Sequence, residues 1–233
     1  MTKTEGIKNI FAEAAGTYDL ANLVLTAGLD RRWRRQAAHY ASSRSGDGIW
    51  LDVNSGTGDM AIRLWKNSKR KARIIATDFS PAMIDVARRK AKNTDIEFKI
   101  ADSGNLPFEN NSVDLVIISF ATRNLNTQPG VLIEYFREFK RVLKPGGVFI
   151  NLETTVPPSK LMKYILYTYA RFFVAPLGYL ISRSAPAYKY LSYTIRHFYT
   201  AGQLKEILYK AGFKKVDYFY LTFGLCAVHT AEK

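Results

Sequence analysis

The stretch Leu51-Asp52-Val53-Asn54-Ser55-Gly56-Thr57-Gly58-Asp59 decides the fold of this chain. A strand-like run ends at Val53, two glycines follow, and a helical pattern begins directly after them. Because glycine has no Cβ, the backbone can turn tightly here and come close to a ligand. The free N–H groups at the start of the next helix point into the same space, which suits a nucleotide-like ligand. The stretch therefore predicts a strand–turn–helix unit that binds a nucleoside cofactor.

An acid at the end of the second strand-like run supports this prediction. Asp78 follows the run 73–77, and a carboxylate in that place suits hydrogen bonds to ribose hydroxyls. The pattern Gly56-x-Gly58-x-x-Ala61 also fits the loose dinucleotide fingerprint, which is a weak signal on its own. These residues thus predict a nucleoside cofactor without saying which one.

Strand-like and helix-like runs alternate along most of the chain. Asp30 and Ser80 stand where they could cap the second and third helices. Such alternation predicts an α/β, Rossmann-like, doubly wound and mostly parallel sheet, in which ligands bind at the carboxyl ends of the strands. The predicted strands are 49–53, 73–78, 96–100, 113–118 and 147–152, and the predicted helices are 5–16, 30–40, 81–92 and one from Pro129 onward.

The C-terminal part of the chain follows a different pattern. Thr200 and Gln203 resemble a capping box, and Gly212 should end the helix that they begin. Two strand-like runs at 216–221 and 224–230 then predict an antiparallel hairpin, which completes a seven-stranded sheet. Earlier in the chain, Lys144-Pro145-Gly146-Gly147 predicts a turn.

Length and composition favour a single domain. The chain has 233 residues, of which 47% are hydrophobic, so it can bury a sizeable core. We predict one domain over 1–233, with an N-terminal helical cap at 1–45 and a helical insert at 157–199. The insert is rich in tyrosine, phenylalanine and leucine, and it should cover the ligand end of the sheet, where a large apolar acceptor would be selected.

The formal charge of +14 leaves the partners open. Nucleic acid and an anionic membrane surface are both compatible with it, and so is a solvated basic surface without any partner. The absence of a long basic tail disfavours a dedicated nucleic-acid binder. The first residues lack an apolar signal core, which favours a cytoplasmic protein, and the scattered histidines with the single Cys226 predict neither a metal site nor an intramolecular disulfide.

Four blocks in order resemble class I S-adenosylmethionine-dependent methyltransferases. They are the glycine turn with its following acid, 101–108, 112–118 and 141–147. The resemblance implies S-adenosylmethionine as the cofactor. It also implies that the methionine part contacts the turn, Asp78 the ribose, and Asp102 and Ser103 the adenine, with Ser119 beside the sulfur. The cofactor residues implied in this way are Asp52, Gly56, Thr57, Gly58, Asp78, Asp102, Ser103 and Ser119.

Further blocks resemble the ubiquinone/menaquinone-biosynthesis C-methyltransferases within that class. They are 18–22 with Arg32 and Trp33, 119–125, 152–155, 192–198 and 212–229. This resemblance implies methylation of a ring carbon of a prenylated quinol such as demethylmenaquinol. The chain departs from the family pattern at Asp30, where histidine is usual, and at Thr122, where an apolar residue is usual. The alternatives are methylation of another lipid or small aromatic acceptor, and a non-catalytic basic binding module.

The implied chemistry needs a base and a positive charge near the forming phenolate. Arg123 is the first candidate for the charge, because arginine stays protonated. Asn124 could orient the ring oxygen, and Tyr18 could cover the cofactor or bind the acceptor. His197 and Glu153 are the candidate bases.

The insert also predicts contact with a membrane surface. The prenyl tail of such an acceptor lies in the bilayer, so the insert and the N-terminal helix would form an apolar mouth on that surface. The apolar contacts predicted are Tyr164, Tyr167, Phe172, Phe173, Leu177 and Tyr179, and the cationic contacts predicted are Lys160, Lys163, Arg171 and Arg183.

Overall fold

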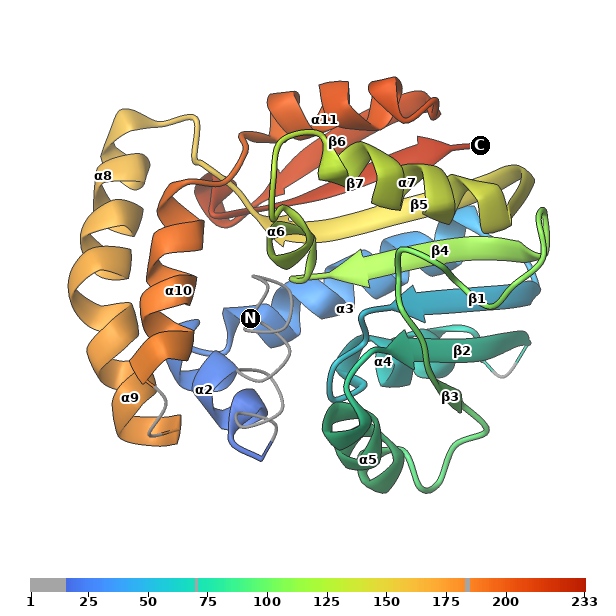
Figure 1. Cartoon of the computed structure of the whole chain (residues 1–233), viewed down its shortest axis with the longest axis horizontal. Helices are drawn as coiled ribbons and strands as arrows, with labels where there is room; N and C mark the ends of the chain where they lie inside the picture. The colour runs from blue at the N-terminus through green and yellow to red at the C-terminus, as the bar shows by residue number, and fades with distance from the viewer. Residues whose placement is uncertain (1–15, 70, 183–184) are drawn as a thin grey trace.

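The computed structural model describes residues 16–69, 71–182 and 185–233. Of the helix predicted at 5–16, only the last position falls within these ranges, so that prediction lies outside the described residues. Figure 1 shows one central sheet with helices on both sides and a separate group of helices at one end of it.

The sheet has seven strands in the order β3-β2-β1-β4-β5-β7-β6. The first five strands pair in parallel, and β7 pairs antiparallel with both β5 and β6. The strands are β1 (Gly48–Val53), β2 (Ala72–Asp78), β3 (Glu97–Ile100), β4 (Val113–Ser119), β5 (Leu143–Thr154), β6 (Lys214–Leu221) and β7 (Cys226–Glu232). The predicted doubly wound sheet with a C-terminal antiparallel hairpin is therefore confirmed.

Two apolar clusters fill the two faces of the sheet. On one face, α3 (Leu29–Arg44) and α4 (Asp59–Asn67) pack Trp33, Met60 and Leu64 against buried side chains of β1, β2 and β4. On the other face, α7 (Val131–Val142) and α11 (Ala201–Lys210) pack a group that includes Phe136, Phe139 and Leu204. The hydrophobic period of each helix thus matches the face that it covers. Cys226 is fully buried in the first cluster.

A third apolar cluster joins the N-terminal helix to the insert. It contains Ala21 and Leu25 of α2 (Tyr18–Leu25) together with Ala170, Val174 and Tyr188. The insert comprises α8 (Lys160–Tyr169), the π-helix η1 (Ala170–Val174), α9 (Ala175–Ser182) and α10 (Ala185–Arg196). Figure 1 shows these helices beyond the carboxyl end of the parallel strands.

The local signals for helix ends are largely confirmed. Ser80 caps α5 (Pro81–Lys90) by accepting a hydrogen bond from the N–H of Met83, and Thr200 with Gln203 forms the predicted capping box of α11. Asp30 is not the cap of α3, however. Gly28 holds that position at φ +77°, a left-handed angle that glycine adopts readily, and Asp30 lies in the first turn.

The predicted turn at 144–147 is also different in the structure. These residues belong to β5, where the pairing with β4 shifts between Val113–Leu143 and Leu115–Val148. Gly146 lies at φ +75° in this irregularity. The extra residues are absorbed as a bulge, which keeps β5 continuous from Leu143 to Thr154. The short helix α6 (Thr122–Leu125) and the 3₁₀ turn η2 (Thr222–Gly224) complete the fold.

Candidate active site

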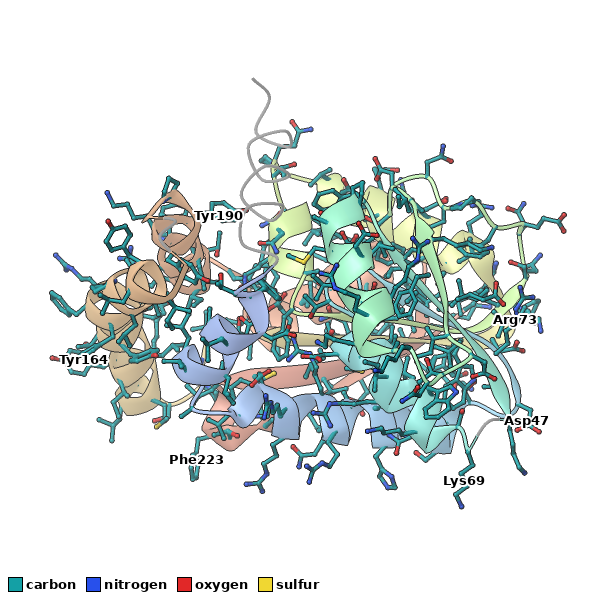
Figure 2. The ribbon with its side chains drawn as sticks, turned by 90° about the horizontal axis from the view of Figure 1, so that it is seen from below. Asp47, Lys69, Arg73, Tyr164, Tyr190 and Phe223 are labelled. Carbon is teal, nitrogen blue, oxygen red and sulfur yellow. The ribbon has the colours of Figure 1, made fainter. Side chains whose placement is uncertain are left out.

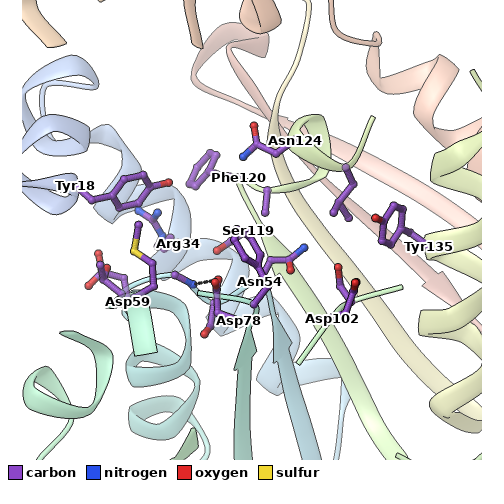
Figure 3. A pocket seen from close by; sticks show the side chains of 18 of the residues that line it. Tyr18, Arg34, Asn54, Asp59, Asp78, Asp102, Ser119, Phe120, Asn124 and Tyr135 are labelled. Atoms are coloured by element: carbon purple, nitrogen blue, oxygen red, sulfur yellow. Dashed lines mark hydrogen bonds between the residues drawn. The ribbon is translucent and has the colours of Figure 1, made fainter. Parts of the chain in front are cut away.

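A cavity lies at the carboxyl ends of β1, β2 and β4, where the glycine turn meets α4. Figure 3 shows Tyr18, Arg34 and Asp59 on one side of it and Asp102 and Tyr135 on the other, with Asp78 between them. Of the predicted site residues, the cavity is lined by Tyr18, Gly56, Thr57, Asp78, Asp102, Ser103, Ser119 and Asn124. The structure does not bring Asp52, Gly58 or His197 to its wall.

The two glycines of the turn, Gly56 and Gly58, have different structural roles. Gly56 lies at φ +54° and a Cβ there would meet no atom within 4 Å, so this residue leaves open room in the cavity. Gly58 lies at φ +80°, and its Cβ would come within 3.0 Å of the Cβ of Ala87. Gly58 therefore allows α4 and α5 to pack closely. Only Gly56 is placed to allow a close approach of a ligand to the backbone.

Asp78 is held firmly at the end of β2. One carboxylate oxygen accepts a hydrogen bond from the N–H of Gly56 at 2.9 Å and the other accepts from the N–H of Ser80 at 2.9 Å. Burial raises the pKa of Asp78, while the hydrogen bonds from Ser80 and Gly56 act in the opposite direction. The backbone N–H of Phe79 also donates to this carboxylate. Because a carboxylate offers about four acceptor sites, Asp78 can still accept a hydrogen bond from a ribose.

The opposite side of the cavity carries the residues predicted for adenine. Asp102 fixes its own turn by accepting a hydrogen bond from the N–H of Gly104 at 2.8 Å. Ser103 is buried beside it, and Tyr135 closes this side with its ring. Burial, and next the charge of Asp102, raise the pKa of Tyr135, so its hydroxyl stays protonated and can donate a hydrogen bond.

Asp52 lies in β1 beneath the glycine turn and is completely buried. Neither oxygen of its carboxylate makes a well-aligned hydrogen bond to a described residue. Burial raises the pKa of Asp52 to about 8, and the charge of Arg34 and the N–H of Ala61 offset this only in part. Asp52 is therefore a buried acid with unused hydrogen-bonding capacity below the methionine side of the predicted site.

Arg123 begins a cluster at the ends of β4 and β5. Its Nη1 donates to Glu153 at 2.8 Å and to the hydroxyl of Thr154 at 2.5 Å, and its backbone N–H also donates to Glu153. The side chains of Arg123 and Glu153 are 9% and 1% exposed. Glu153 is thus the buried partner of Arg123, and it lines no cavity at the ends of these strands, which does not suit the role of a base.

His197, the other candidate base, lies away from both cavities. Its ring stacks on Tyr193 at 4.2 Å between centroids and its Nδ1 contacts the backbone oxygen of Tyr193. The residue is exposed near the end of α10. These contacts explain His197 as a surface residue of the insert.

A second cavity of about 470 Å³ lies between α2, α3 and the insert, and we call it the apolar chamber. It shares Arg34 and Phe120 with the first cavity, so the two adjoin. Arg123 and Thr154 lie in its wall, and most of its other lining residues are apolar: Val24, Leu25, Leu29, Trp33, Leu166, Tyr169, Val174, Leu177, Leu191, Ile195 and Leu225.

Arg34 is one of the lining residues that the sequence analysis did not identify. Its guanidinium lies 4.8 Å from the ring centre of Phe120, and its Nη1 donates to Asp30 at 2.5 Å in an ion pair that is 7% exposed on both sides. Arg34 is the only buried arginine of the run 31–35, because its position on α3 faces the sheet. The spacing of Asp30 and Arg34, four residues apart on a helix, was the available signal.

The fold and the cavity together define the class of protein. Among solved structures, a SAM-dependent methyltransferase from Thermotoga maritima aligns over 97% of this chain and 99% of its own, with a TM-score of 0.63 and 18% identity. A phosphoethanolamine N-methyltransferase from Haemonchus contortus aligns over 81% of this chain and 49% of its own, with a TM-score of 0.57 and 18% identity. The fold is that of the Rossmann-like methyltransferases.

The chain belongs to the ubiE/COQ5 methyltransferase family, whose sequence model matches residues 1–233. It is 35% identical to a demethylmenaquinone methyltransferase from Bacteroides fragilis, over 99% of this chain and 94% of that protein. It is 34% identical to the ubiquinone/menaquinone biosynthesis C-methyltransferase UbiE of Pseudomonas fluorescens, over 99% of this chain and 90% of that protein. The chain is therefore a methyltransferase, and the family indicated by its blocks is confirmed.

Proposed function

We propose that this methyltransferase transfers the methyl group of S-adenosylmethionine to a ring carbon of a prenylated quinol, with demethylmenaquinol as the acceptor. The family and the names of the relatives support the reaction class. The observation that carries the proposal is the pair of adjoining cavities. One has the polar residues for a nucleoside, and the other is apolar and contains Arg123.

The first cavity fits S-adenosylmethionine on the chemistry of its own residues. Asp78 can accept from the ribose, and Gly56 leaves room at the turn. Asp59 and Arg34 both line this cavity and lie on the same side of it (Figure 3), so a carboxylate and a guanidinium face the same space. An amino-acid head group carries both charges and so matches an acid and a base held together. When bound, this cosubstrate supplies an activated methyl group.

Arg123 is placed to favour the reactive form of the acceptor. A neutral phenol, whose pKa is about 10 by analogy with tyrosine, is a weak carbon nucleophile. Loss of its proton moves electron density onto the neighbouring carbon. A fixed cation beside the oxygen favours that change, and Glu153 and Thr154 hold the guanidinium of Arg123 before any ligand arrives.

An anaerobic assay with a demethylmenaquinol that bears one prenyl unit tests the function. The wild-type protein should form the C-methylated quinol and S-adenosylhomocysteine in equal amounts. Arg123→Ala should still bind S-adenosylhomocysteine by calorimetry but turn over about a hundredfold more slowly, because one preorganised charge is lost. Arg137→Ala, which removes an exposed arginine on α7 that pairs with Glu134, is the matched control and should behave as wild type. No methylation of this quinol, with methylation of another aromatic acceptor, would overturn the assigned substrate.

We also propose that the insert contacts an anionic membrane surface. Within α8, η1 and α9 the exposed fractions of Leu161, Tyr164, Phe172 and Leu180 are 66%, 70%, 59% and 71%, and α8 has no buried residue. Figure 2 shows Tyr164 directed outward at the end of the molecule that the insert forms. No helix in the described ranges is long and apolar enough to span a membrane.

The charges and the other apolar residues of the insert bear on this proposal. Lys160, Lys163 and Arg171 are exposed beside the apolar side chains, and each adds about 1 kcal/mol of attraction to anionic lipid. Phe173 and Tyr179 are also exposed, at 52% and 46%. Leu177 differs from the sequence-based expectation, because it packs against the third cluster and lines the apolar chamber. Tyr167 is only partly exposed, and Arg183 lies outside the described residues.

Co-sedimentation with vesicles tests the contact. The protein should bind vesicles that contain phosphatidylglycerol, and the bound fraction should fall at high salt because the electrostatic part is screened. A Leu161→Ser, Tyr164→Ser variant should bind more weakly. Tyr209→Ser, which changes a 43% exposed tyrosine on α11, serves as the control. If wild-type protein ignores these vesicles at low salt, the membrane proposal fails and the reaction proposal stands.

A further inference from the structure

The apolar chamber contains one side chain that can take a proton from a phenol. Among the described residues that line it, Asp30 is the only carboxylate and no histidine is present. The two bases considered from the sequence do not compete for this role. Glu153 is absent from the chamber wall, whereas Asp30 lines it, and His197 stacks on Tyr193 at the surface.

Hydrogen bonds hold the carboxylate of Asp30 in place but do not use all of its acceptor sites. One carboxylate oxygen accepts from Nη1 of Arg34 at 2.5 Å, and the other accepts from the hydroxyl of Thr26 at 2.9 Å. The Asp30 side chain is 7% exposed. A carboxylate offers about four lone-pair sites, so each oxygen can still accept one further hydrogen bond. Asp30 can therefore receive an acceptor hydroxyl without giving up either partner.

The position of Asp30 relative to the cofactor is set by Arg34. Arg34 lines both cavities, and Asp30, one helical turn earlier on α3, lines only the chamber. The carboxylate thus lies on the chamber side of the wall that separates the two cavities. Asp30 on α3 and Arg123 on α6 both line the chamber, so an acceptor ring held there has a carboxylate and a guanidinium in the wall around it.

We propose that Asp30 is the general base of methyl transfer, and this inference rests on the proposed function. Asp30 accepts the proton of the acceptor hydroxyl, and the oxygen–hydrogen electron pair forms a carbonyl. The neighbouring ring carbon then forms its bond to the methyl group, while the methyl–sulfur electron pair stays on sulfur. Asp30 returns its proton to the oxygen, and the hydrogen on the methylated carbon leaves to water as a proton. One proton is released overall and the ring regains its aromaticity.

Arg123 and Asp30 take complementary parts in this scheme. Arg123 already has a buried carboxylate partner and cannot accept a proton, whereas its charge stabilises a developing phenolate. Asp30 removes the proton, and Arg34 keeps a cation beside the carboxylate throughout. A base is needed because the quinol enters the chamber neutral and neither arginine can accept its proton.

The test compares acceptors of different acidity. Wild type, Asp30→Asn, Asp30→Glu and Asp30→His are assayed anaerobically with the one-prenyl demethylmenaquinol and with a ring-fluorinated analogue whose hydroxyls are more acidic. Asp30→Asn should lose about a hundredfold or more in kcat/KM at neutral pH with the ordinary acceptor. The loss should shrink with the fluorinated acceptor and at high pH, because an ionised phenol needs no base. Asp30→Glu and Asp30→His should retain part of the rate, since both side chains accept protons.

Thr26→Val is the matched control, because it removes a hydrogen bond to Asp30 and leaves the carboxylate in place. It should lower the rate equally for both acceptors. Calorimetry of S-adenosylhomocysteine binding verifies that each variant is folded. If Asp30→Asn does not bind, Asp30→Ser, which also lacks a carboxylate, takes its place with the same expected result. Equal losses for both acceptors in Asp30→Asn, or no loss, would overturn the base assignment and leave the reaction intact. No methylation by wild type would overturn the proposed function and this inference with it.

Discussion

At the residue scale, Arg34 has hydrogen-bonding capacity that no described residue uses. Only its Nη1 makes a hydrogen bond, and its buried Nε has no partner. We expect Arg34 to bind the carboxylate of the methionine part of the cofactor. Arg34→Gln should therefore reduce the binding free energy of S-adenosylhomocysteine by about 2 kcal/mol, which is typical of a hydrogen bond to a charged group. Calorimetry should show unchanged affinity for 5′-methylthioadenosine, which lacks the amino acid.

The comparison of two ligands separates binding from folding. A damaged cavity would lower the affinity for both ligands equally, and that result would contradict the role of Arg34 in binding the carboxylate. Arg35→Gln, which changes the exposed neighbour of Arg34 on α3, is the control and should leave both affinities unchanged. The result would not depend on any acceptor, so it tests the cofactor cavity alone.

The sequence predicted single residues well where a local pattern restricts the backbone. Asp78 and Gly56 follow from a glycine turn and a strand end, and both line the cavity. Arg34 and Asp30 were not recognised as site residues, because a pair four residues apart on a helix usually indicates a solvated ion pair. Whether such a pair is buried depends on which face of α3 meets the sheet, and that is decided by tertiary packing.

At the element scale, α2 is attached to the core by a polar network that we call the latch. Asp19 of α2 accepts from the hydroxyl of Thr57 at 2.5 Å, and Lys90 of α5 bridges Asp19 at 2.5 Å and Asp59 at 2.6 Å. Tyr18, the neighbour of Asp19, lines the cofactor cavity. The latch therefore holds α2 beside the cavity, on the side where Figure 3 shows Tyr18 and Asp59.

Lys90→Met should loosen α2. The change leaves Asp19 and Asp59 facing each other without their shared cation. A partly exposed ion pair contributes about 1 kcal/mol, so S-adenosylhomocysteine should dissociate about fivefold faster. Stopped-flow displacement measures this rate, with Lys66→Met on α4 as an exposed control. An unchanged dissociation rate would show that α2 does not restrain the ligand.

The elements themselves were predictable for a physical reason, namely that each helix buries one regular face and the central strands are short apolar runs buried on both faces. All seven strands of the sheet fall on predicted runs, with ends that differ by a few residues. The insert was harder, since its aromatic residues serve two surfaces. Tyr169 and Leu177 face the chamber, while Tyr164 and Phe172 face solvent, and composition alone does not separate them.

At the scale of the whole molecule, three apolar clusters explain why the two cavities adjoin. Two clusters cover the faces of the sheet, and the third joins α2 to the insert beyond its carboxyl edge. The third cluster contains residues of α2 and of the insert, which are far apart in the sequence, so the chamber forms only when these two segments come together. Its location could not be read from local pattern, because it depends on contacts between distant segments.

The free energy of unfolding of the whole protein should depend on pH through the ionisation of Asp52. Burial raises its pKa from 3.8 to about 8, so the folded protein holds a proton that the unfolded chain loses. The free energy of unfolding should therefore fall as the pH rises from about 4 to about 8, because ionisation of Asp52 favours the unfolded state. The fall is about 1.4 kcal/mol for each pH unit within that range. Asp52→Asn cannot ionise. Urea unfolding at pH 5 and pH 8 should therefore show a larger fall in stability for wild type than for the variant, and equal falls would mean that Asp52 is ionised in the fold.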